Sequence, residues 1–93
     1  MKRCVKIKVM GKVQGVAYRA FAQKHAHDLN VEGTIQNADD GSVVILACGP
    51  SENLDKLIDH LYKGTSKSVV IELTVEPLIN EKDFRGVFRI IGE

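Results

Sequence analysis

The chain has 93 residues, of which 44% are hydrophobic and 27% are charged, a composition typical of one small globular domain over residues 1–93. Thirteen basic and twelve acidic side chains leave a net charge of +1, which argues against a nucleic-acid or membrane-surface partner. No apolar run approaches the roughly 20 residues of a membrane span, and lysines interrupt the N-terminal apolar stretch. We therefore expect a cytoplasmic protein without a signal peptide.

Two strand patterns flank one helical pattern in the first part of the chain. Apolar and polar side chains alternate over residues 2–10, which predicts a strand with one buried side. Apolar residues recur at helical spacing over residues 18–29. Asn30 tolerates the left-handed conformation that ends many helices. Residues 33–37 predict a second, shorter strand.

A hairpin and a second helix follow. Asp39, Asp40 and Gly41 favour a tight turn, which accounts for the two adjacent carboxylates without a catalytic role. Residues 42–48 are apolar on both faces, which indicates a central strand. Residues 49–51 open a helix that Gly64 ends. The apolar stripe of this helix is predicted to lie in the core, and it consists of Leu54, Leu57, Ile58, Leu61 and Tyr62.

Two strands complete the order of elements. Residues 69–76 alternate, with apolar side chains at positions 71, 73 and 75, and Pro77 ends the run. Residues 87–91 predict a short final strand. This order is the split βαβ pattern of the ferredoxin-like α+β fold, with a mainly antiparallel sheet of order 4-1-3-2 and both helices on one face. In that topology the first and second strands end at the same edge of the sheet, which brings the loop after residue 10 close to Asn37.

That loop has the features of an anion site. Gly11 and Gly15 allow a tight turn and a close approach of the backbone to a ligand. The helix that follows directs unpaired N–H groups and its positive end into the turn. Arg19 lies in the first helical turn and can add a bidentate guanidinium. From the loop alone, an ordinary strand-to-helix turn with a solvated arginine is an equally good interpretation.

Two motifs in this region resemble the signatures of the acylphosphatases, small enzymes that hydrolyse acyl phosphates. The first is Gly-x-Val-Gln-Gly-Val-x-Tyr-Arg over residues 11–19, and the second is Gly-Thr-Ile-Gln-Asn-x-x-x-Gly-x-Val over residues 33–43, closing at Gly49. Chain length and element order also match the family. The chain departs from the usual pattern at Tyr18, Thr34, Ile35 and Gln36, positions that bear on substrate preference and rate more than on reaction class.

The resemblance implies roles for individual residues. Arg19 and Asn37 match the family's catalytic arginine and asparagine, which hold the phosphate and orient a water molecule. The predicted phosphate-binding residues are Gln14, Gly15, Val16, Ala17, Tyr18 and Arg19. An acyl phosphate and its product, inorganic phosphate, are the expected ligands. No cofactor or metal ion is expected, and we expect a monomer.

Two other classes of protein were compatible with the order of elements. An RNA-binding module of this fold stacks bases on sheet aromatics, but aromatic residues make up only 5% of the chain and tryptophan is absent. An anion-binding regulatory or accessory domain would keep the phosphate loop without efficient turnover, and the sequence does not exclude it. A simple acyl-phosphate assay distinguishes this alternative from an enzyme.

The remaining reactive side chains predict structure more than chemistry. His25 is expected to be partly buried and His60 exposed, with no metal cluster. Cys4 lies near the start of the first strand and Cys48 near the end of the third, and these antiparallel ends meet. If Val43 faces the core, as in the family pattern, both sulfurs lie on the opposite face and close enough for a possible disulfide. Its position at the sheet end opposite Arg19 and Asn37 predicts no effect on catalysis.

Overall fold

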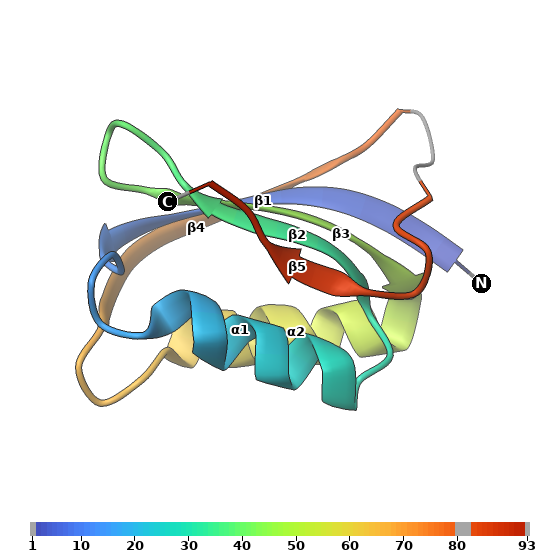
Figure 1. Cartoon of the computed structure of the whole chain (residues 1–93), viewed down its shortest axis with the longest axis horizontal. Coiled ribbons are helices and arrows are strands. Elements are labelled where there is room, and N and C mark those ends of the chain that lie inside the picture. Colours follow the sequence, from blue (N-terminus) through green and yellow to red (C-terminus); the bar gives the residue numbers. More distant parts are fainter. Residues whose placement is uncertain (1, 80–82, 93) are drawn as a thin grey trace.

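The computed structural model describes residues 2–79 and 83–92. Its elements match the predicted order, with boundaries shifted by a few residues (Figure 1). They are β1 (Lys2–Lys12), α1 (Tyr18–Asp28), β2 (Glu32–Asn37), β3 (Val43–Pro50), α2 (Ser51–Lys63), β4 (Val69–Pro77) and β5 (Phe88–Ile90). None of the described helices is long and apolar enough to cross a membrane.

The five strands form one sheet in the order β4-β1-β3-β2-β5. The pairs β1–β3, β1–β4 and β2–β3 are antiparallel, whereas β5 is parallel to β2. Both helices cover the same face of the sheet (Figure 1). The ferredoxin-like fold and the order 4-1-3-2 are therefore confirmed, and β3 is the central strand as predicted.

The topology also brings the two predicted site segments to one end of the molecule. The loop between β1 and α1 lies at the left of Figure 1, and the hairpin between β2 and β3 lies at the same end of the sheet. The hairpin closes through a hydrogen bond of 2.8 Å from the Ala38 N–H to the Ser42 carbonyl. Asn37, the last residue of β2, is thereby held beside this closing bond.

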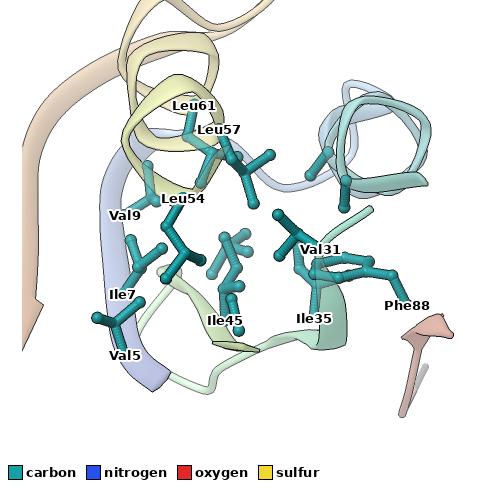
Figure 2. Close-up of a cluster of buried hydrophobic side chains, with 14 of the residues drawn as sticks. Val5, Ile7, Val9, Val31, Ile35, Ile45, Leu54, Leu57, Leu61 and Phe88 are labelled. Atoms are coloured by element: carbon teal, nitrogen blue, oxygen red, sulfur yellow. The ribbon is translucent and has the colours of Figure 1, made fainter. Parts of the chain in front are cut away.

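The core lies between the sheet and the two helices (Figure 2). Alternate residues of β1 point into it, and the α2 stripe meets them from the other side. The fully buried side chains of β1 and α2 are Val5, Ile7, Val9, Leu54, Leu57 and Leu61. Burial of one such side chain contributes roughly 1.5–3 kcal/mol, so these two elements hold the frame on which the loops rest.

The prediction that Tyr62 lies in the core was wrong, and the alternation predicted for residues 69–76 is interrupted. Tyr62 is 61% exposed, because it lies about 100° further round α2 than Leu61 and the buried stripe is narrower than the sequence suggests. Ile71 is 77% exposed and Val75 is 39% exposed. Consecutive residues Met10 and Gly11 of β1 pair with positions 72 and 70 of β4, so Ile71 is the extra residue of a β-bulge and the predicted alternation breaks there.

The two cysteines form a disulfide. Cys4 and Cys48 are direct partners in the β1–β3 register, and their Cα atoms are 4.1 Å apart. Their exposed fractions are 7% and 0%, and neither belongs to the main apolar cluster between sheet and helices. The predicted strand register and the proximity of the two thiols are therefore confirmed.

Candidate active site

The loop between β1 and α1 has an unusual backbone. Gly15 has φ = 74° and Ala17 has φ = 60°, whereas Val16 between them is not among the residues with positive φ. A left-handed conformation is easy for glycine but costs an alanine roughly 1–2 kcal/mol. Alternation of hand along a chain turns successive N–H groups toward one point and forms an anion-binding concavity. The strain at Ala17 is of the kind that functional loops retain.

The N-terminus of α1 is open. Ala17 is its N-cap residue, no side chain caps it, and its first turn contains no acidic residue. Within the described part of the chain, the N–H groups of Gly15, Val16 and Ala17 donate to no protein acceptor. These free donors and the positive end of the helix together favour a bound anion.

Two buried polar atoms lack a hydrogen-bond partner among the described residues. They are Nη1 of Arg19 and Oδ1 of Asn37. A buried polar atom without a partner costs roughly 1–3 kcal/mol, and more when the group is charged, so such atoms are rare in folded proteins. Within the described ranges, the two predicted catalytic residues are thus the two whose side chains keep a buried polar atom without a partner.

A cavity of about 210 Å³ adjoins the loop. Its lining residues are Val13, Gly15, Ala17, Tyr18, Arg19, Ala20 and Ile90. The structure therefore brings four of the predicted phosphate-binding residues to one hollow. The other two, Gln14 and Val16, lie outside its lining, and so does Asn37.

Gln14 links the loop to the hairpin that carries Asn37. Its side-chain Nε2 donates to the Ala38 carbonyl at 2.9 Å and to the Ser42 carbonyl at 2.8 Å. The amide thus donates one hydrogen to the carbonyl of each of the two residues that close the hairpin. The prediction for Gln14 concerned only its backbone N–H, and this side-chain contact was missed, although a carboxamide inside the glycine loop was a usable signal.

Tyr18 anchors the first turn of α1 to α2. Its ring is 1% exposed, and its hydroxyl donates to the Leu61 carbonyl at 2.7 Å. Burial raises the pKa of the Tyr18 hydroxyl well above its ordinary value. The phenol therefore remains a neutral donor, and its role at this position is structural.

The other ionisable side chains near the site have structural partners. Asp40 accepts from the Ser42 N–H at 3.0 Å and the Ser42 hydroxyl at 2.5 Å, and it pairs with Lys8 at 3.0 Å. These contacts, those of Ser42 first, lower the pKa of the Asp40 carboxyl. The expected turn role of this aspartate is borne out.

The histidines lie away from the loop, on the paired helices. His25 is stacked on His60 with ring centroids 3.9 Å apart, so His60 is half-buried and not exposed as predicted. Burial, with the charge of His60 as a second cause, lowers the pKa of His25. No group of three or more metal-ligating side chains occurs among residues 2–79 and 83–92.

The cavity wall from β5 was the second feature that the sequence did not reveal. Ile90 belongs to the last strand, and nothing in its local pattern distinguishes it from the neighbouring Ile91. Only the parallel pairing of β5 with β2 places it opposite the loop.

Known proteins resemble the chain over most of its length. The sequence profile of the family described as "Acylphosphatase" matches residues 5–90. An acylphosphatase of Clostridium acetobutylicum is 41% identical over 86 residues, which cover 88% of this chain and 93% of the relative. One of Shewanella amazonensis is 48% identical over 68 residues, covering 73% and 75%. The crystal structure of acylphosphatase from Bacillus subtilis superposes with a TM-score of 0.92 at 33% identity, covering 99% of this chain and all of that one.

Proposed function

The chain belongs to the acylphosphatase family and is a hydrolase of acyl phosphates, and we propose that Arg19 and Asn37 carry this reaction. In the proposed complex the phosphoryl group lies against the loop between β1 and α1. The backbone N–H groups of residues 14–18 and the guanidinium of Arg19 hold its oxygens. Asn37 orients the water that attacks phosphorus.

The reaction demands little acid–base chemistry. The leaving group is a carboxylate whose conjugate acid has a pKa near that of an ordinary side-chain carboxyl, about 4, so no general acid has to protonate it. What remains is to hold the phosphoryl group, to stabilise its charge and to place water in line with the breaking bond. Fixed N–H donors and a guanidinium perform the first two tasks without a metal ion.

Asn37 suits the third task because its amide both donates and accepts hydrogen bonds. Its Oδ1 is buried and has no protein partner among the described residues, so it is available to accept from water. The Gln14 side chain ties the hairpin next to Asn37 to the loop. This tie supports a fixed distance between the held phosphate and the attacking water.

The observation that carries the proposal is the pair of unpartnered buried atoms, Arg19 Nη1 and Asn37 Oδ1. Folding tolerates the cost of both atoms if a ligand satisfies them. The second candidate function is an anion-binding accessory domain of the same fold. It would need Arg19 but not Asn37, so the unused acceptor on Asn37 favours the enzyme.

We also propose a cytoplasmic monomer that acts on small acyl phosphates in solution. The net charge of +1 supports neither a nucleic-acid nor a membrane-surface partner. A disulfide is uncommon in a reducing compartment, but this one is nearly inaccessible, since Cys4 is 7% exposed and Cys48 is fully buried. Poor access slows attack by cellular thiols.

The test is hydrolysis of acetyl phosphate by the unmodified protein and by Arg19→Lys. We expect Arg19→Lys to lose at least about a thousandfold in kcat/KM, because a point charge cannot reproduce the bidentate fork. Arg3→Lys is the matched control: Arg3 contacts Ser51 and Asp55 at the other end of the sheet, and activity should remain within about twofold. EDTA should leave the rate unchanged. Near-normal activity of Arg19→Lys would refute the assigned role.

A further inference from the structure

One wall of the cavity is contributed by the last strand. Of its seven lining residues, Ile90 alone lies outside residues 13–20. Its side chain is 38% exposed, so it borders the opening. Ala20, on the outer side of the first turn of α1, lines the same hollow.

This wall is fixed on both sides. Ile90 pairs with the fully buried Ile35 in the β2–β5 register. The next residue, Ile91, donates its N–H to the Ile35 carbonyl at 2.9 Å. From the helix layer, the Gln23 side chain donates to the Phe88 carbonyl at 2.9 Å. Ile90 is therefore held at a set distance from the loop.

The polar groups of the cavity lie on one side, and the rest of its lining is apolar. Arg19 supplies the one charged side chain in the lining, and the free N–H groups lie on the same loop. The remaining side chains are apolar, apart from the Tyr18 hydroxyl, which is already bonded to Leu61. A phosphoryl group that uses Arg19 and the N–H groups would leave its acyl substituent facing Ala20 and Ile90.

We propose that Ile90 and Ala20 form the acyl-group subsite, and that this subsite favours acyl phosphates with an apolar acyl group. The inference rests on the proposed placement of the phosphate at Arg19. A second carboxylate on the acyl group would find no partner charge in the lining, so this wall would offer it no stabilising contact.

The chain offers a matched control for Ile90. Ile91 is the adjacent residue, is also an isoleucine and is 37% exposed against 38% for Ile90. It does not line the cavity. Truncation of either residue removes the same atoms from adjacent positions at the end of β5, so a difference between the two variants reports on contact with the substrate.

The experiment measures kcat/KM for benzoyl phosphate and acetyl phosphate in the unmodified protein, Ile90→Ala and Ile91→Ala. Ile90→Ala should lose about tenfold with benzoyl phosphate, since a few methylene contacts in a pocket give an effect of about this size. The loss with acetyl phosphate should be less than about twofold, and inhibition by inorganic phosphate should not change. Ile91→Ala should leave the ratio of the two substrates unaltered.

Equal losses on both substrates, or equal effects of the two variants, would overturn the subsite. If Ile90→Ala does not fold, Ile90→Val replaces it, with an expected loss of about threefold confined to benzoyl phosphate. A failure of the subsite is distinct from a failure of the proposed function. In the first case acetyl phosphate is still hydrolysed in an Arg19-dependent manner, and in the second that dependence is absent.

Discussion

The two ends of the sheet differ in whether their polar side chains have hydrogen-bond partners in the protein. At the end that holds the disulfide, Arg3 donates to the Ser51 hydroxyl at 2.8 Å and lies 3.5 Å from an Asp55 oxygen. At the other end, Arg19 keeps Nη1 buried without a partner among the described residues. Within the described residues, the same residue type thus has protein partners at one end and keeps a buried atom without a partner at the other.

The asparagines show the same contrast. Asn53, on α2, donates from Nδ2 to the Leu29 carbonyl at 2.8 Å and ties the start of α2 to the C-terminal end of α1. Asn37 has a buried Oδ1 with no protein donor in the described ranges. Stability is therefore concentrated where partners are complete, and chemistry is expected where they are incomplete. Substitutions at the two ends should separate these properties.

After the loss expected for Arg19→Lys, the largest expected effect in this comparison is that of Asn37→Ala on turnover. We expect kcat for acetyl phosphate to fall by about a hundredfold or more, the size of effect seen when a group that acts in the transition state is removed. Affinity for inorganic phosphate, measured by competitive inhibition or calorimetry, should change little, because Arg19 and the N–H groups remain.

Asn53→Ala is the control for this change. It should lower stability, since the Leu29 carbonyl loses its donor, and leave kcat within about twofold. If Asn37→Ala weakened phosphate binding as much as it lowered kcat, Asn37 would be a binding residue, and the water-orienting role would be wrong.

The second prediction concerns the opposite end. The Cys4–Cys48 disulfide closes a loop with a sequence separation of 44 residues, which stabilises the fold by about 3–4 kcal/mol through restriction of the unfolded chain. Reduction by dithiothreitol should lower the free energy of unfolding in urea by that amount. Activity at 25 °C should not change, because the bond lies at the end of the sheet away from Arg19.

A double variant, Cys4→Ala with Cys48→Ala, separates the bond from a general effect of the reductant. It should be as unstable as the reduced parent protein, with or without dithiothreitol, and it should keep full activity. An unchanged urea midpoint after complete reduction of the parent protein would show that the disulfide contributes nothing to stability.

The sequence predicted the fold because its signals were local and mutually consistent. Alternation in β1 and the helical stripe of α2 specify opposite sides of one core, and the order of elements then leaves one sheet topology. That topology alone predicted the meeting of the Cys4 and Cys48 strand ends, which the register confirms. Burial of β4 could not be predicted in the same way, because the bulge at Ile71 depends on its pairing with β1.

The site was predictable only in part, for a related reason. The two motifs identify Arg19 and Asn37 by resemblance, and the glycines indicate a loop. The left-handed Ala17 has no sequence signal, since alanine rarely adopts that conformation. The Gln14 bridge and the Ile90 wall depend on which segments the fold brings together, and neither partner is within 20 residues of the other in sequence.

The smallest expected effect is that of a substitution at Tyr18. This residue contributes both to the stability of the fold and to the proposed phosphate loop. Its backbone is part of the proposed phosphate loop, while its hydroxyl satisfies the Leu61 carbonyl in the last turn of α2. That carbonyl has no alternative donor four residues on, because the Thr65 N–H is bonded to the Ser68 hydroxyl at 2.8 Å. Tyr18→Phe should therefore lower the free energy of unfolding by about 1–2 kcal/mol, the cost of a buried acceptor left without a partner.

The kinetic constants should not change with this loss of stability. Tyr18→Phe keeps the ring and the backbone N–H, so kcat and KM for acetyl phosphate should remain within about twofold. Tyr62→Phe is the matched control, because Tyr62 is 61% exposed and removal of its hydroxyl should leave both stability and rate unchanged. Urea unfolding of the three proteins measures the difference. A Tyr18→Phe variant as stable as the parent would mean that the Leu61 carbonyl does not depend on this hydroxyl. A selective loss of kcat would instead assign the hydroxyl to the active site, and the residues that stabilise the fold would then not be distinct from those that carry the reaction.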